Sequence, residues 1–283
     1  MSYMRLNTSA KAKIGEFLSD DRLRQVAPSI FATEAHESRS DRFAPVPTID
    51  VLNGLRREGF EAVMAGQSKS RDPGRRDFTK HMLRLRHRSE DALVVGSEVF
   101  EVVLINANDG TSAYKMMPGV FRLVCLNGLM CGDTYDEVKV RHSGNAIDEV
   151  IEGAFRVLDE RAKVTGQVGA FKSIAMSPEE RVVMADAAHL LRFPDRDEKP
   201  IGVKPLQLLD ARRVDDQTRD LWTTMNVLQE NMIRGGQSGW VRDANNRKRR
   251  QSTREINGID QNRILNRALW TLTEKMAELK RAG

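Results

Sequence analysis

Hydrophobic and polar residues follow two different rhythms along the chain. Between residues 60 and 142 the apolar runs are short, often repeat with the period of two that a strand gives, and are separated by turn signals. After Gly144 apolar residues recur at helical spacing, as in Ile147, Val150, Ile151 and Ala154. Strands followed by helices predict an α+β fold, here a hairpin-rich antiparallel sheet followed by a bundle of about four helices.

The strand-like half contains several candidate strands. Thr79 to His87 alternates and predicts a half-buried strand with a basic outer face, whereas Val99 to Asn106 is apolar on both faces and predicts a central strand. The other candidates are 60–64, 112–117, 120–125 and 138–142. Turn signals lie at Asn108-Asp109-Gly110, Pro118-Gly119 and Asn127-Gly128, residues 65–77 are predicted to be a loop, and a short helix capped by Thr48 is expected to end near Gly59.

The helix-like half carries clear boundary signals. Ser177-Pro178-Glu179-Glu180 combines an N-cap, a proline at the first helical position and a capping box, and Pro194 ends that helix. A helix through Leu221 and Met232 is expected to stop at Gly235-Gly236, and a last helix spans Leu265 to Leu279. We expect three parts: a mobile N-terminal arm at 1–40, the sheet with flanking helices at 41–165, and a helical region packed on the sheet at 166–283, with a basic loop at 234–254.

Composition is that of a folded and moderately basic protein. Of the 283 residues, 40% are hydrophobic and 30% are charged, which is typical of a globular protein with a sizeable core. The formal net charge is +5 and the pI is about 9.3, so an acidic partner fits. No apolar run approaches a membrane span, the N-terminus has no signal-peptide core, and two cysteines in a chain of this length fit a reducing compartment. We expect a cytoplasmic protein.

The two cysteines lie in LVCLNGLMCG, residues 123–132. Cys125, Cys131 and His142 supply three of the four ligands that a structural zinc site needs, and no fourth is in register. The spacing is not that of a Cys-x-x-Cys redox motif, and a catalytic cysteine needs an adjacent histidine that the sequence does not place. We favour a hairpin that turns at Asn127-Gly128, with the cysteines as small apolar residues.

The first of two basic segments runs from Lys69 to Arg88 and contains only Asp72 and Asp77 as acidic residues. If the strand alternates as predicted, several cations project from one face beside a basic loop and form an electrostatic footprint for a phosphate backbone. The alternative is an ordinary solvated face. The candidate binding residues are Lys69, Arg71, Arg75, Arg76, Lys80, Arg84 and Arg86.

The second basic segment, RGGQSGWVRDANNRKRRQSTR at 234–254, combines cations with glycines and one tryptophan. Basic residues attract a phosphate backbone, and an exposed aromatic ring stacks on an unpaired base. The alternative is a basic linker between helices, with its tryptophan packed on the core. The candidate binding residues are Trp240, Arg247, Lys248, Arg249 and Arg250, and Tyr114 is a second candidate for stacking.

Signals for an enzyme are weak. The sequence has no Walker loop, no Gly-x-Gly-x-x-Gly after a strand, no His-Glu-x-x-His and no Gly-x-Ser-x-Gly. Asp133, Asp136 and Glu137 cluster, but acidic residues between strands are more often turn residues. His189 has apolar neighbours, which favours a packed histidine. We predict no catalytic residue, metal or cofactor.

One stretch resembles a known family. The Asp109-Gly110 turn with Ser112 and Tyr114, the run FRLVCLNGL at 121–129 and RHSG at 141–144 are similar to phage-, prophage- and plasmid-borne proteins of domain-of-unknown-function family 932 (YafZ/YfjQ-like). A weaker similarity continues to NRALWTL at 266–272, so the resemblance covers most of residues 40–275. It implies mobile-element biology in a bacterial or phage cytoplasm, and it carries no catalytic residue over to this chain.

The expected order of elements also resembles the core of Rad52-type single-strand annealing proteins, in topology alone. We therefore expect a non-enzymatic protein that binds and anneals single-stranded DNA as a homo-oligomer such as a ring. The alternative is a mobile-element protein that binds a host protein partner and inhibits a host defence or nucleic-acid-binding complex. A metal enzyme that uses Asp133 or Asp136 ranks last.

Overall fold

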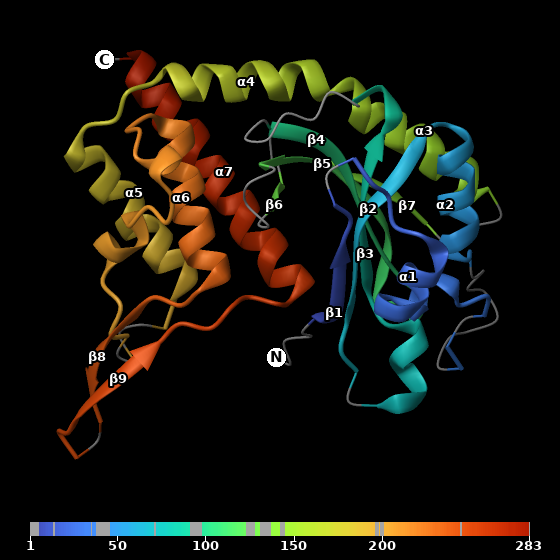
Figure 1. The fold of residues 1–283 in the computed structure, drawn as a ribbon, viewed down its shortest axis with the longest axis horizontal. Helices are drawn as coiled ribbons and strands as arrows, with labels where there is room; N and C mark the ends of the chain where they lie inside the picture. Colours follow the sequence, from blue (N-terminus) through green and yellow to red (C-terminus); the bar gives the residue numbers. More distant parts are fainter. Residues whose placement is uncertain are drawn as a thin grey trace. The chain divides into compact units, whose positions relative to one another are not determined.

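The computed structural model of the chain describes residues 6–282 except 14, 35, 38–45, 71, 91–97, 123–127, 131–136, 142–144, 196–197, 199–200 and 244. The chain forms two compact units (Figure 1). The first comprises Met1–Cys131, Tyr135–Ala162 and Asn257–Asp260, and the second comprises Gly132–Thr134, Lys163–Ile256 and Gln261–Gly283. The three-part division drawn from the sequence stays a prediction.

The first unit is built on an antiparallel sheet with the strand order β1-β2-β3-β4-β5-β6, in which β7 also pairs with β5. Strands that follow one another along the chain lie side by side from β1 to β6, which is the arrangement that hairpin connections produce. This confirms the predicted α+β class and its antiparallel sheet. The strands are β1 (Leu6–Lys11), β2 (Phe60–Ser68), β3 (His81–His87), β4 (Glu98–Ala107), β5 (Ser112–Arg122), β6 (Gly128–Met130) and β7 (Val138–Val140).

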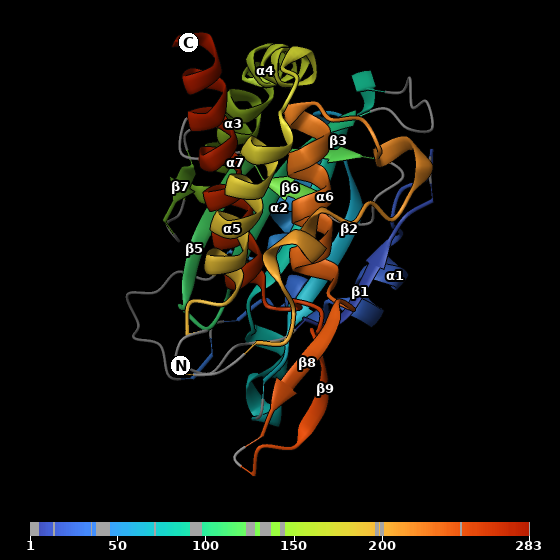
Figure 2. The ribbon, with the colours of Figure 1, turned by 90° about the vertical axis from the view of Figure 1, so that its left-hand side faces the viewer.

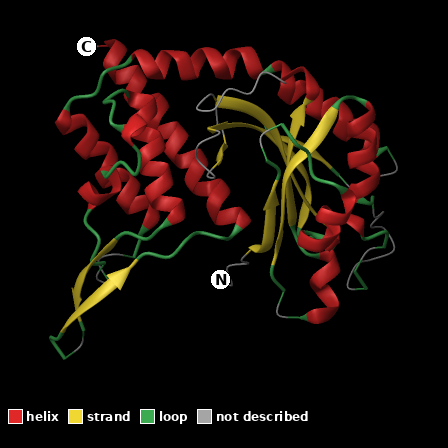
Figure 3. Cartoon of the chain, viewed as in Figure 1, coloured by secondary structure: helices red, strands yellow, loops and turns green. Residues whose placement is uncertain are grey.

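Two helices, α2 (Thr48–Arg57) and α3 (Ala146–Asp159), pack against each other and against the strands (Figure 3). Gly54 lets them approach closely, because a Cβ there would lie 3.0 Å from the Cδ1 of Ile151. The unit also contains α1 (Asp20–Val26) and the short 3-10 helices η1 (Pro28–Phe31), η2 (Pro73–Phe78) and η3 (Arg88–Glu90).

The central strand β3 is buried on both of its faces. Leu83 is in register with Leu104, which is in register with Met116, and Met116 lies against α3 beside Gly153. On the other face Met82 belongs to a hydrophobic cluster that is closed by Ile259, at the start of α7. A strand in this position has no solvated face, whatever its sequence alternation suggests.

Three strand predictions are wrong in detail. Strand β2 continues beyond Met64 to Ser68, because it pairs with both β1 and β3. Strand β5 runs straight through Pro118-Gly119 in register with β4, since pairing along a long neighbour outweighs a local turn preference. The N-terminal region, where the sequence predicts no strand, supplies β1 at the edge of the sheet.

The second unit is helical, and its predicted boundaries are largely confirmed. The Oγ of Ser177 accepts a hydrogen bond from the Glu180 backbone N–H, and the Glu180 carboxylate accepts one from the Ser177 backbone N–H, which completes the capping box. The helix that the sequence stops at Gly235 does end there, with φ 67° at that glycine. The helices are α4 (Arg161–Ser173), α5 (Pro178–Arg192), η4 (Pro205–Leu209), η5 (Val214–Asp216), α6 (Leu221–Arg234) and α7 (Ile259–Ala282), of which residues 161–162 and 259–260 belong to the first unit. Among the described residues, no helix has the length and apolarity needed to cross a membrane.

The second unit also contains a two-stranded antiparallel hairpin, formed by β8 (Ser238–Arg242) and β9 (Lys248–Ser252). Two perpendicular views show it extending away from α5 and α6 (Figures 1 and 2). The sequence predicts a basic loop here, because strands rich in arginine and glycine lack the apolar alternation that indicates a strand.

Candidate nucleic-acid interface

The hairpin places an aromatic ring and three cations on one face. Trp240 lies opposite Arg250, and Arg242 lies opposite Lys248. Opposite residues of an antiparallel pair share a face, and so do residues two apart along a strand. Trp240, Arg242, Lys248 and Arg250 therefore make up one surface, the hairpin face.

The hairpin face is open to solvent. Trp240 is 63% exposed, and the three cations are also exposed. Arg250 donates one hydrogen bond to the Oγ of Ser238, and Arg242 donates to the backbone and side-chain oxygens of Asn246. Most of the five N–H donors of each guanidinium therefore remain available to a ligand.

The acidic residue of the hairpin, Asp243, forms hydrogen bonds within the turn. The Oδ1 of Asp243 accepts hydrogen bonds of 2.9 Å from the backbone N–H groups of Asn245 and Arg247. Asn246 adopts a left-handed conformation with φ 61°, which asparagine tolerates better than most residues. Asp243 is itself exposed, so the hairpin carries one exposed carboxylate against five exposed cations, Arg242, Arg247, Lys248, Arg249 and Arg250.

The opposite face of the hairpin is docked on the rest of the second unit. Gly239 and Gln251 lie on that face, and the Oε1 of Gln251 accepts a hydrogen bond of 2.8 Å from the Gly202 backbone N–H. A Cβ on Gly239 would lie 1.6 Å from the Gly202 carbonyl oxygen, so only glycine allows this approach. Docking of the Gly239 side leaves the hairpin face turned to solvent.

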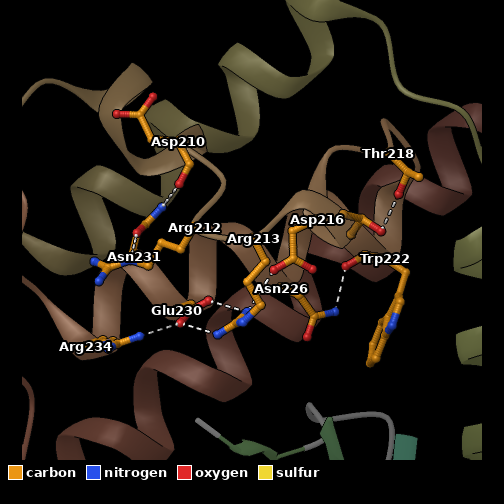
Figure 4. A network of polar contacts seen from close by, with 11 residues as sticks. Asp210, Arg212, Arg213, Asp216, Thr218, Trp222, Asn226, Glu230, Asn231 and Arg234 are labelled. Carbon is orange, nitrogen blue, oxygen red and sulfur yellow. Dashed lines mark hydrogen bonds and ion pairs between the residues drawn. The ribbon is translucent and has the colours of Figure 1, made fainter. Parts of the chain in front are cut away.

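A polar network on α6 holds the root of the hairpin (Figure 4). The Oδ1 of Asn231 accepts hydrogen bonds from the Nε of Arg212 at 2.7 Å and from the Nε2 of Gln237 at 2.8 Å. Its Nδ2 donates to the carbonyl oxygen of Leu208, in η4, and to that of Asp210, which directly follows η4. Arg212 also donates to the carbonyl oxygen of Gly235, where the chain leaves α6. Asn231 thus connects the hairpin to the helix that is most buried in this unit.

Arg192 at the end of α5 donates hydrogen bonds to the backbone both before and after the hairpin. Its Nε donates to the Met232 carbonyl oxygen at 3.0 Å, and its Nη2 donates to the Arg254 carbonyl oxygen at 2.8 Å. Burial lowers the pKa of both Arg192 and Arg212 from the usual arginine value, but a guanidinium stays protonated at any physiological pH. The root is therefore held by charged donors on backbone oxygens, which are stronger than neutral hydrogen bonds.

The rest of the network is an ion cluster around Glu230 (Figure 4). Arg213 donates to both carboxylate oxygens of Glu230, at 2.6 and 2.8 Å, and to the Oδ2 of Asp216 at 2.8 Å. Because both buried carboxylates accept from one guanidinium, the cluster fixes η5 to α6 and presents no free acid or base. These residues are not among the candidates predicted from the sequence. The signal for them is polar residues, such as Asn226 and Glu230, inside the apolar helix LWTTMNVLQENMIR.

The exposure expected for the cations of β3 is wrong. Arg84 and Arg86 are 4% and 5% exposed, and both pair with Glu101 of β4. Lys80 is also buried, and its Nζ lies 2.7 Å from the Oδ2 of Asp260. The alternation was correct, but the face assumed to be solvated is covered by the cluster around Ile259.

Tyr114 is fully buried and therefore presents no ring for stacking. Its hydroxyl donates to the Val46 carbonyl oxygen at 2.7 Å and lies 3.1 Å from the Oγ1 of Thr48. Burial raises the pKa of Tyr114 well above its usual value. Thr48 does not cap α2, whose N-cap is Pro47; its hydroxyl instead joins a buried polar network with His81 and Asn106.

The remaining candidates of the first basic segment lie at an exposed site. Lys69, Arg75 and Arg76 are exposed, the last two in η2, where Asp72 caps the helix by accepting from the Gly74 backbone N–H. Arg71 lies outside the described residues. This segment belongs to the first unit and the hairpin to the second.

The metal candidates fall outside the part of the chain that the structure describes. The residues concerned are Cys125, Cys131, His142, Asp133 and Asp136. Asn127 of the predicted Asn127-Gly128 turn also lies outside the described residues. Among the described residues no group of His, Cys, Asp and Glu is arranged to hold a metal ion. His189 is packed as expected, with its Nε2 2.8 Å from the Val203 carbonyl oxygen.

Comparison with known proteins places the chain in a family. The family described as "Domain of unknown function (DUF932)" matches residues 35–270. UPF0380 protein YafZ and UPF0380 protein YfjQ, both from Escherichia coli (strain K12), are each 44% identical over 259 residues, which cover 92% of this chain and 91% of each relative. No solved structure matches the chain, so the likeness to Rad52-type proteins is not supported. The predicted family is confirmed: this chain is a member of the DUF932 family.

Proposed function

We propose that this protein binds single-stranded DNA through the hairpin face and acts without catalysis. The observation that carries the proposal is the exposed ring of Trp240, directly opposite Arg250 and flanked by Arg242 and Lys248 on the same face. A base stacks on the indole while the cations contact the neighbouring phosphates. A duplex hides the faces of its bases, so this arrangement favours an unpaired strand.

The way in which the hairpin is held supports the same proposal. Gly239 is docked on one side, and Asn231 and Arg192 hold the two chain ends of the root. A surface that is ordered before it binds loses little conformational entropy on binding. The hairpin face is thus a prepared surface and not a mobile basic linker.

Annealing needs no catalytic group in this proposal. Cations reduce the repulsion between two phosphate backbones, so two complementary strands can approach each other. A homo-oligomer adds further hairpin faces along the same strand, which raises the overall affinity by effective concentration.

Fluorescence anisotropy with a labelled single-stranded oligonucleotide tests the proposal. Trp240→Ala is expected to weaken binding about 5- to 150-fold, the value of one stacked base, and Trp240→Phe is expected to keep most of the affinity. Phe17, an exposed aromatic residue of the first unit, supplies the matched control, and Phe17→Ala should bind as the wild type does. Wild-type affinity in Trp240→Ala, or equal affinity for duplex and single strand, would overturn the proposal.

A further inference from the structure

The sheet of the first unit contains a second cationic cluster, which is buried. Arg84 and Arg86 of β3 share one carboxylate, that of Glu101 on β4. The Nε of Arg84 lies 2.5 Å from Oε2 of Glu101, and the Nη2 of Arg86 lies 2.6 Å from Oε1. Glu101 is 1% exposed, so all three charged groups are removed from water.

The cluster has one positive charge in excess. A guanidinium does not lose its proton in a protein, so two cations face one carboxylate. Glu61 is in register with Arg86 but pairs with others, at 2.5 Å from Arg88 and 3.6 Å from Arg56. A buried charge without a counter-charge is strongly unfavourable, so an additional anion would stabilise this cluster.

Two guanidinium nitrogens identify where such an anion would bind. The Nη2 of Arg84 and the Nε of Arg86 are buried and have no hydrogen-bond partner among the residues that the structure describes. Each carries an N–H group that shares the positive charge. Buried donors of this kind are rarely left unsatisfied in native proteins, because each one costs about 1–3 kcal/mol or more.

The surroundings fix the orientation of these donors. The guanidinium carbon of Arg84 lies 3.3 Å from the centre of the Phe121 ring, so one flat side of the group is covered. Gly119, opposite Glu101, makes room for this ring, since a Cβ there would lie 2.4 Å from the Cε2 of Phe121. The stacked guanidinium keeps its N–H groups in a defined plane, as binding of an oxyanion requires.

We propose that Arg84 and Arg86 bind a small oxyanion with the chemistry of phosphate. Such an ion supplies the missing negative charge and accepts the two unsatisfied N–H groups at the same time. The same chemistry is offered by free inorganic phosphate and by the terminal phosphate of a nucleic-acid strand. The site is in the first unit and does not rest on the proposed role of the hairpin.

Isothermal titration calorimetry of the full chain with inorganic phosphate tests this site, alongside thermal unfolding in phosphate and in chloride at equal ionic strength. Wild type is expected to show saturable heat with a stoichiometry near one, and a melting temperature about 3 °C higher at ten times Kd. Arg86→Met leaves a neutral Arg84–Glu101 pair, so it should lose both effects. Arg156→Gln, which removes an exposed cation of α3 that pairs with Glu152, should keep them.

Absence of saturable heat in the wild type would overturn the proposal, and so would an equal rise in melting temperature in Arg86→Met, which general salt effects produce. If Arg86→Met does not fold, Arg84→Lys is used, which keeps the charge but loses the planar fork. This variant should weaken phosphate binding at least tenfold, and unchanged binding would count against the site. A 5′-phosphorylated oligonucleotide that competes with phosphate, where its 5′-hydroxyl counterpart does not, identifies a strand terminus as the source; equal behaviour of the two identifies the free ion.

Discussion

Two arginine-rich strands of this protein have opposite surroundings. Strand β3 reads HMLRLRH and β9 reads KRRQS. The arginines of β3 are at most 5% exposed, whereas those of β9 are open to solvent. Strand β3 pairs on both edges and is covered on both faces. Among the described strands β9 pairs only with β8, and the hairpin docks with one face.

The difference shows that neighbours, and not the arginines themselves, decide what these cations do. A buried guanidinium must be compensated, so Arg84 and Arg86 converge on Glu101 and contribute to the interior of the sheet. An exposed guanidinium interacts weakly with its own chain and can bind a ligand. Only the second situation presents several cations on an open surface, along which a nucleic-acid strand can lie.

Removing the shared carboxylate should have the largest effect. Glu101→Gln leaves two buried cations without a counter-charge, so the free energy of unfolding is expected to fall by about 3–5 kcal/mol. Urea denaturation measures this change. Glu278→Gln, which breaks the exposed pair with Lys275, is the control and should leave the midpoint unchanged. An equally small change in both variants would mean that the buried ion pairs of Glu101 contribute no more to stability than the exposed pair does.

Neutralising the hairpin face should change binding but not folding. In the triple variant Arg242→Gln, Lys248→Gln, Arg250→Gln, the slope of log affinity for single-stranded DNA against log salt should flatten by about 2, which is about 100-fold in affinity at 0.1 M salt. A salt titration by anisotropy measures this slope, with urea denaturation as the check on folding.

The matched control removes three exposed cations from helix α4, Arg161, Lys163 and Lys172. Its salt slope should equal that of the wild type. A slope that flattens equally in both variants would show that net charge, and not the hairpin face, governs binding.

A side chain placed between the hairpin and its docking site at Gly202 should have an intermediate effect. Gly239→Ala forces a Cβ against the Gly202 carbonyl, and overpacking of this kind costs about 1–3 kcal/mol. We expect a lower thermal midpoint together with weaker DNA binding, because the hairpin face is displaced. Gly166→Ala on α4, where a Cβ meets no atom within 4 Å, should instead be neutral or stabilising. Unaltered binding by Gly239→Ala would show that docking does not orient the hairpin face.

The smallest effect is expected for an exposed ion pair. Hydrogen bonds from Lys280, and then from the Ser177 backbone, lower the pKa of Glu180 below its usual value. A lowered pKa stabilises the fold above the unfolded-state value of about 4.3, and this contribution is lost as the pH falls through the folded-state pKa. Glu180→Gln keeps the capping box but removes the charge. At pH 7 the thermal midpoint of this variant should be slightly lower than that of the wild type, and the two midpoints should converge in acid. A difference that persists unchanged at low pH would contradict this assignment.

The sequence predicts best where a structure depends on nearby residues. The capping box at Ser177, the helix stop at Gly235 and the turn at Gly110, with φ 72°, are all confirmed because each is formed within a few residues. The apolar run from Val99 to Asn106 also becomes the predicted central strand, since residues apolar on both faces can only be accommodated inside a sheet. The family likewise follows from short runs of residues.

The sequence by itself thus determined the fold class, most helix boundaries, the family and the two basic segments. Only the tertiary structure decided that Arg84, Arg86 and Tyr114 are buried, that β5 continues through Pro118, and that residues 238–252 form a hairpin with Trp240 and its cations on one open face. Burial depends on which strands and helices cover a residue, and these covering residues lie far away in the chain. Alternation along a strand shows only that its two faces differ. The neighbouring elements then determine which face is exposed to water.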